Sequence, residues 1–258
     1  MKLKIDVQMS YDLDPSGTVL LTLELAEFPG QRILRSALDI DHARVSRVQG
    51  AEGIGQRTWA RISYPQMWLG YTAQVEVTRP KVELAPLAHT PMHDLPGETL
   101  SFLRPSRFCQ SDKFATFVDR RFGDMQGGAK VAAILEWIAE EMIYVPTASN
   151  SETTVMETFV DRQGVCRDYV HMVCALCRAA GIPARYASVY GSGVTPPDFH
   201  AVAEVWLDGA WRLVDATGMC APDEMAVIAV GRDACDVAFM ETEGPAMLIS
   251  QSVTVTAA

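Results

Sequence analysis

The sequence predicts an α+β fold, in which an N-terminal antiparallel β-sandwich-like domain precedes a core of helices packed on an antiparallel sheet. Two observations support this. The first ~80 residues alternate apolar and polar side chains with a period of two, as half-buried strands do. The middle of the chain instead repeats apolar residues at helical spacing. The chain has 258 residues, which leads us to expect two modest domains.

The N-terminal strands are predicted from their alternation. In residues 2–9 the apolar side chains fall on one parity and the polar or charged ones on the other. Residues 19–25 alternate again, and an Asp-Pro-Ser-Gly turn at 14–17 separates the two segments. The same pattern, typical of an antiparallel sheet or small sandwich, continues near 33–40, 56–64 and 70–78.

The helices begin after a proline-rich stretch without periodicity, which is typical of a connector on a surface. Apolar residues then recur at helical spacing in 114–122 and 131–142. Thr154 and Glu157 have capping-box spacing, which predicts a third helix that ends before Gln163. The predicted division is 1–80 for the β domain, 81–105 for the linker and 106–258 for the core.

The segment 165–180 is predicted to be a buried helix, because apolar residues cover most of its circumference. It stops at Gly181-Ile182-Pro183. Further strands are expected at 184–190, 200–207, 210–215 and 247–256.

Composition and charge exclude several classes of function. Lys and Arg number 22 against 32 Asp and Glu, and a net charge of −10 lacks the electrostatic footprint of a nucleic-acid binder. The N-terminus alternates charged and apolar residues, unlike a signal peptide, and no apolar run of ~18 residues occurs. We therefore expect a cytoplasmic protein without a membrane or nucleic-acid partner, whose six cysteines are reduced. The oligomeric state is left open.

Cys166 is the first candidate for chemistry. It follows Gly164-Val165 at the predicted start of the buried helix, where unpaired N–H groups and the helix dipole stabilise a thiolate. The same N–H groups suit the oxyanion of a tetrahedral intermediate. Taken alone, the position also fits a small buried residue.

A nucleophilic thiol needs a base, and His171 fails on geometry. Five residues at 100° each place it about 140° around the helix from Cys166, so a structural hydrogen bond suits it better. Asp208-Gly209 instead predicts a tight hairpin in which Leu207 faces Ala210.

The register of this hairpin places His200 and Asp215 on one face, diagonal to each other at a Cα separation of roughly 7–8 Å. An imidazole that exchanges the proton and a carboxylate that orients it are what thiol catalysis requires.

The remaining cysteines indicate no second site. Cys174 and Cys177 fall inside the apolar helix, where burial makes a thiol inert. A zinc site would need further ligands at finger-like spacing, and the sequence has no calcium loop of the EF-hand type. We expect activity without a metal or cofactor.

These residues resemble the core of the bacterial transglutaminase-like superfamily of cysteine proteases, and the first ~80 residues resemble its N-terminal β domain. The resemblance implies a papain-like core with Cys166 as nucleophile, His200 as base and then acid, and Asp215 as orienter. Ala216 stands where the family usually has Pro. The matching segments are 102–109, 164–172 (Gly-Val-Cys-Arg-Asp-Tyr-Val-His-Met), 176–186, 198–205 (Asp-Phe-His-Ala-Val-Ala-Glu-Val), 215–218 (Asp-Ala-Thr-Gly) and 231–237.

The function expected is thiol-dependent hydrolysis of an amide, peptide or isopeptide bond in a peptide or protein substrate, through an acyl-thioester on Cys166. Two alternatives stay open: acyl transfer to an amine, as transglutaminases perform, and a non-catalytic peptide-binding module. Tyr144 and Gln163 are the candidates for a second oxyanion donor.

Overall fold

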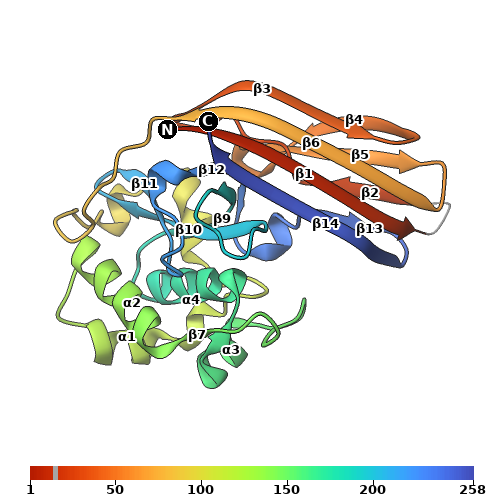
Figure 1. The fold of residues 1–258 in the computed structure, drawn as a ribbon. Helices are drawn as coiled ribbons and strands as arrows, with labels where there is room; N and C mark the ends of the chain where they lie inside the picture. The colour runs from red at the N-terminus through yellow and green to blue at the C-terminus, as the bar shows by residue number, and fades with distance from the viewer. Residues whose placement is uncertain (14–16) are drawn as a thin grey trace.

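The computed structural model describes residues 1–13 and 17–258 and confirms the α+β class. The predicted turn at 14–17 lies, except for Gly17, outside the described residues. Two antiparallel sheets, built mainly from the N-terminal part of the chain, lie face to face, and the helices gather on the far side of a third sheet (Figure 1). The two termini lie side by side, where Ala258 donates its N–H to the carbonyl of Lys2 at 2.9 Å.

The first sheet has the order β14-β1-β6-β3. Its predicted alternation is confirmed in β1, where Leu3, Ile5, Val7 and Met9 are all buried. The second sheet has the order β13-β2-β5-β4. The strands of the two sheets are β1 (Lys2–Leu13), β2 (Thr18–Leu21), β3 (Gln31–Ile40), β4 (Ala43–Gln49), β5 (Gln56–Ile62), β6 (Gln66–Val77), β13 (Met240–Thr242) and β14 (Ala246–Ala257).

β4 was not predicted, because its residues are exposed or half-buried throughout and show no one-sided apolar alternation. The C-terminal strands require a correction. The predicted core ran to residue 258, but β14 pairs with β1, and β13 pairs with β2. Alternation can reveal a strand at 247–256 but not its partner, which lies more than 200 residues away in the chain. The division 1–80, 81–105 and 106–258 into domains otherwise stays a prediction.

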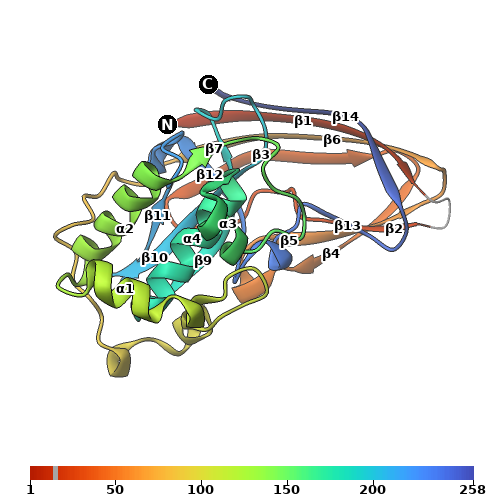
Figure 2. The same cartoon turned by 90° about the horizontal axis from the view of Figure 1, so that it is seen from below.

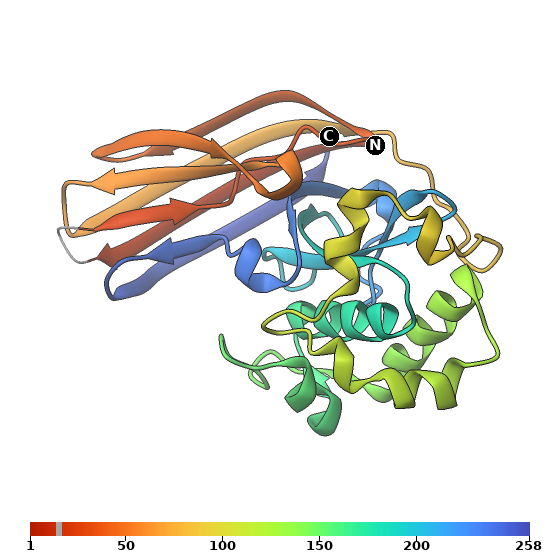
Figure 3. The same ribbon diagram turned by 180° about the vertical axis from the view of Figure 1, so that it is seen from behind.

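The linker passes along the third sheet before it reaches the helices (Figure 3). Thr154 caps the third helix as predicted, since its N–H donates to the Glu157 carboxylate at 2.7 Å. The helices are α1 (Ala115–Phe122), α2 (Gly127–Glu141), α3 (Val155–Asp161) and α4 (Cys166–Ala179), with short 3-10 helices at Ala51–Gly53, Met92–Asp94, Gly97–Leu103, Ser111–Lys113, Pro222–Glu224 and Ala234–Asp236.

The third sheet has the order β11-β10-β9-β12, and the buried helix α4 packs across β9 and β10 (Figure 2). The predicted hairpin register is confirmed, with Leu207 opposite Ala210 and Ala203 opposite Val214. Asp208 and Gly209 both have positive φ, as a two-residue type I′ turn requires. The strands are β9 (Ala184–Gly191), β10 (His200–Leu207), β11 (Ala210–Val214) and β12 (Met225–Gly231), and β12 was not predicted.

The third sheet is joined to the N-terminal sheets by buried hydrogen bonds. Tyr190 donates its hydroxyl to the Leu23 carbonyl at 2.9 Å, and the Gln31 amide donates to the Val227 carbonyl at the same distance. None of the helices in residues 1–13 and 17–258 combines the length and apolar character needed to cross a membrane.

Candidate active site

Cys166 is the first residue of α4, as predicted. The backbone around it is held by Asp168, a fully buried residue whose carboxylate accepts the Val165 N–H at 2.8 Å and the Ser149 hydroxyl at 2.5 Å. Gly164 permits this approach, because a Cβ there would lie 2.6 Å from the Cβ of Asp168. The thiol is therefore presented at a fixed helix N-terminus, where the helix dipole favours negative charge.

His200 is the first residue of β10, and its ring Nε2 lies 3.0 Å from Asp215 Oδ2. The side chains are 1% and 3% exposed, so the pair is shielded from solvent. Asp215 also accepts the Thr217 N–H at 2.9 Å, the Thr217 hydroxyl at 2.6 Å and the Cys220 N–H at 2.9 Å. These contacts fix the carboxylate, which in turn fixes the ring.

The surroundings of the pair shift both pKa values toward the charged forms. Burial lowers the pKa of His200, but Asp215 and the neighbouring Cys166 outweigh it and raise that pKa to about 9. Burial raises the pKa of Asp215, but the hydrogen bonds from His200, Thr217 and the Cys220 backbone bring it below its usual value. An imidazolium beside a carboxylate is thus the favoured state near neutral pH.

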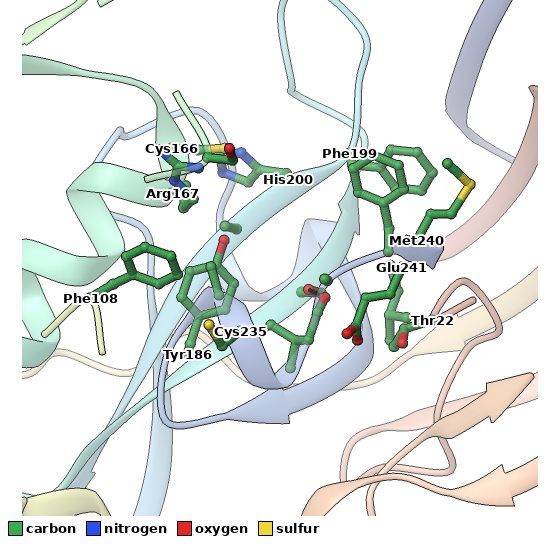
Figure 4. A pocket seen from close by; sticks show the side chains of 18 of the residues that line it. Thr22, Phe108, Cys166, Arg167, Tyr186, Phe199, His200, Cys235, Met240 and Glu241 are labelled. Atoms are coloured by element: carbon green, nitrogen blue, oxygen red, sulfur yellow. Dashed lines mark hydrogen bonds between the residues drawn. The ribbon is translucent and has the colours of Figure 1, made fainter. Parts of the chain in front are cut away.

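Cys166 and His200 line the same cavity, which has a volume of about 670 Å³. Figure 4 shows the Cys166 sulfur beside the His200 ring, with Arg167 next to them. The other ring nitrogen, His200 Nδ1, is buried and has no hydrogen-bond partner among the described residues. With Nε2 occupied by Asp215, Nδ1 is the nitrogen left to exchange a proton at the sulfur.

The two oxyanion candidates are placed differently. The short strands β7 (Ile143–Tyr144) and β8 (Gln163–Gly164) pair in parallel and set Tyr144 opposite Gly164. Burial, followed by the nearby Cys166, raises the pKa of Tyr144 to about 12, so its hydroxyl keeps its proton at neutral pH. Neither residue lines the cavity, but Gln163 is exposed, whereas Tyr144 is half-buried and close enough to Cys166 to be affected by it. Tyr144 is thus the better placed of the two.

His171 and the two cysteines inside the buried helix do not line the cavity. His171 is fully buried and accepts the Ala234 N–H at 3.3 Å, and burial holds its pKa well below the usual value. Cys174 and Cys177 are buried inside α4. Across residues 1–13 and 17–258, no group of three or more His, Cys, Asp or Glu side chains is arranged to hold a metal ion.

Several residues of the site were missed by sequence reasoning. The spacing Asp215-x-Thr217 is typical of an Asx turn and could have identified Thr217. Asp168 lies three residues after the helix cap, a position typical of capping carboxylates. The cavity wall from the N-terminal sheets, which includes Thr22, Met240 and Gln251, has no local signal.

Comparison with known proteins gives one family model and several similar proteins. The family model of the transglutaminase-like superfamily matches residues 116–216. A solved structure described as a "putative cysteine protease", from Cytophaga hutchinsonii, is 32% identical, with coverage of 99% of this chain and 90% of that chain and a TM-score of 0.94. The periplasmic domain of TgpA from Pseudomonas aeruginosa is 18% identical, with coverage of 82% and 93% and a TM-score of 0.42.

An uncharacterized protein from Mycobacterium leprae (strain TN) is 25% identical over 146 residues. The aligned part makes up 53% of this chain and 52% of that protein, so the match spans about half the length of the curated relative.

Proposed function

Because the chain belongs to the transglutaminase-like superfamily, we propose that it cleaves an amide, peptide or isopeptide bond through an acyl-thioester on Cys166. The observation that carries the proposal is that the two ring nitrogens of His200 have different surroundings. His200 Nε2 contacts Asp215 at 3.0 Å, while Nδ1 stays unpartnered among the described residues in the cavity that Cys166 also lines. The buried His171 also has an unpartnered Nδ1, but it does not line this cavity, so what sets His200 apart is that its free nitrogen belongs to a ring that shares a cavity with Cys166.

In the acylation step the Cys166 thiolate attacks the carbonyl carbon of the scissile bond, and the C=O electron pair moves onto oxygen. The His200 imidazolium then donates its Nδ1 proton to the leaving nitrogen. The C–N bond breaks as the carbonyl re-forms, which releases an amine and leaves the acyl group on sulfur. Asp215 holds the ring in the tautomer and orientation that this transfer needs.

In the deacylation step His200 Nδ1 accepts a proton from water, and the water oxygen attacks the thioester carbon. Sulfur leaves as the thiolate, and the product is a carboxylic acid. The backbone N–H groups at the start of α4 and the protonated Tyr144 hydroxyl are the donors available to both oxyanions. An amine in place of water would instead give acyl transfer.

Trapping the thioester tests the proposal. We expect a p-nitrophenyl ester of an N-acylated amino acid to add one acyl mass to the protein, to release nitrophenolate in a burst, and to lose the added mass in hydroxylamine. Cys166→Ala should lose the adduct while it keeps its thermal unfolding transition. Mass spectrometry with and without an added alkylamine measures the partition between acid and amide products.

Cys235→Ala is the matched control, because Cys235 is an exposed cysteine that lines the same cavity. An adduct that persists in Cys166→Ala but disappears in Cys235→Ala would contradict the proposal. Absence of any adduct on folded wild-type protein would favour a peptide-binding module.

A further inference from the structure

The cavity that contains Cys166 has two walls of different origin. Figure 4 shows Cys166, Arg167 and His200 at one end and Met240, Glu241 and Thr22 at the other. The first group comes from α4 and β10. The second belongs to β2, β13 and their flanking residues, which are part of the N-terminal sheets. A substrate that reaches the thiol therefore also contacts the β-sheet part of the protein.

The far wall is held firmly against the segment that ends in His200. Thr22 donates its N–H to the Phe239 carbonyl at 2.9 Å, next to the pairing of Met240 with Leu21. On β14, the Gln251 amide donates to the Asp198 carboxylate at 2.6 Å, two residues before His200. The Gln251–Asp198 hydrogen bond thus joins β14 of the N-terminal sheets to the segment that leads into His200.

Aromatic and thioether side chains make up the apolar part of this wall. Phe199 and Phe239 stack with centroids 4.9 Å apart and an interplanar angle of 9°. Tyr190 lies behind Phe199 at 5.8 Å and is itself fully buried. Phe239 nevertheless remains 39% exposed where it lines the cavity, and Met240 extends beside the stacked rings in Figure 4.

An exposed aromatic ring that lines a cavity is suited to bind an apolar group of a ligand, because the contact removes apolar surface of both from water. We infer that Phe199, Phe239 and Met240 form a subsite for a large apolar, preferentially aromatic, side chain of a peptide substrate. The inference rests on the proposed function, since it assigns specificity to the same cleft. Ring stacking and the adaptable Met240 side chain favour an aromatic residue over a small one.

Peptidyl chloromethyl ketones measure this subsite directly, because the Cys166 thiolate displaces chloride to form a stable C–S bond. The probes form a series of tripeptides with Phe at one of the three positions, and Ala elsewhere, compared with the all-Ala tripeptide. Each alkylation rate, followed by intact mass, is divided by the iodoacetamide rate of the same variant, which cancels changes in the thiol itself. We expect Phe to be preferred by about tenfold or more at one position.

Phe239→Ala should bring that preference to within about threefold, and Phe239→Leu, which keeps apolar volume, should retain an intermediate preference. Trp59→Ala is the matched control, because Trp59 is a similarly exposed aromatic residue outside this cavity, and it should leave the preference unchanged. A thermal unfolding scan of each variant verifies that it is folded.

The outcomes separate the two proposals. If iodoacetamide alkylates Cys166 but no position prefers Phe, or the preference survives in Phe239→Ala, the subsite assignment is wrong and the thiol chemistry stands. Failure of every peptide probe to react with an otherwise alkylatable Cys166 also overturns the assignment. If iodoacetamide itself leaves Cys166 unmodified in the folded protein, the proposed function is wrong, and the subsite assignment, which rests on it, is wrong as well.

Discussion

β10 contributes one member to each of two buried acid–base pairs, and the pKa values of the two carboxylates are shifted in opposite directions. His200 at its start pairs with Asp215, and Glu204 four residues later pairs with Arg185 at 2.7 Å. Burial raises the pKa of Glu204 above its usual value despite Arg185, whereas the pKa of Asp215 falls below its usual value. The hydrogen bonds that Asp215 accepts from His200, Thr217 and Cys220 offset its burial. Whether a buried carboxylate stays ionised therefore depends on the hydrogen bonds that it accepts as well as on its burial.

The basic partners of the two carboxylates, Arg185 and His200, also lie in different surroundings. The Arg185 guanidinium lies 4.2 Å from the Trp211 ring centroid and 5.8 Å from that of Phe102, and its side chain is 5% exposed. The His200 ring is equally buried but faces the cavity with a free Nδ1 within the described part of the chain. Arg185 and Glu204 also line a cavity, of about 580 Å³, but no cysteine of the described residues lines it. His200 differs because its free ring nitrogen belongs to a side chain that shares a cavity with the Cys166 thiol.

Replacement of each carboxylate by its amide tests this difference most strongly. Asp215→Asn should lower kcat/KM for an activated acyl donor by about 10³- to 10⁴-fold, because His200 loses its orientation and the partner of its charged form. Glu204→Gln, the matched change in the other pair, should alter kcat/KM by less than about threefold. Steady-state kinetics with p-nitrophenyl esters at pH 7 measure both.

Two outcomes would contradict this distinction between Asp215 and Glu204. Equal losses in both variants would mean that the sheet as a whole, and not Asp215, controls the site. A loss in Asp215→Asn that disappears once rates are corrected for the folded fraction would reduce Asp215 to a structural residue.

For the free energy of unfolding, in contrast to kcat/KM, we expect a large effect of the Arg185–Glu204 pair. Glu204→Ala leaves the Arg185 guanidinium buried without its partner, and we expect the free energy of unfolding to fall by about 3–5 kcal/mol. The double change Arg185→Met with Glu204→Leu removes both charges and should recover most of that loss. Urea denaturation at pH 7 measures both. A double variant as unstable as Glu204→Ala would show that packing around Trp211, and not the unpaired charge, controls stability here.

Much of the site could be predicted because its determinants are local in sequence. Asp208 and Gly209 tolerate positive φ, so a two-residue turn fixes the register that places His200 near Asp215. Cys166 could be placed at a helix start from the glycine and the apolar pattern around it. In both cases a few neighbouring residues restrict the backbone to one arrangement.

The rest depends on pairing between distant segments, for which alternation gives no partner. β14 alternates like β1, yet nothing local in Ala246–Ala257 distinguishes pairing in the N-terminal sheet from pairing in the core. The predicted boundary therefore misplaced the strands that supply Met240 and Gln251 to the cavity. Gln163 was a plausible donor by sequence position alone, but it is exposed on β8.

The smallest expected effect is on the pH dependence of stability. It distinguishes the two pairs because only the His200–Asp215 pair contains a histidine. The pKa of His200 is raised from 6.5 to about 9, so its charged form contributes stability fully below pH 6.5, and this contribution is lost as the pH rises through 9. The lowered pKa of Asp215 contributes above its ordinary value of 3.8 and is lost only in more acidic solution. The stability difference between wild type and Asp215→Asn should therefore shrink between pH 6.5 and 9 in urea titrations, by up to about 2–3 kcal/mol, since Cys166 supplies part of the raised pKa and remains in the variant. The difference between wild type and Glu204→Gln should stay nearly constant over that range, because this pair contains no imidazole. A constant difference for Asp215→Asn across the same range would show that His200 is not held as an imidazolium, and the pair would then resemble a neutral hydrogen bond.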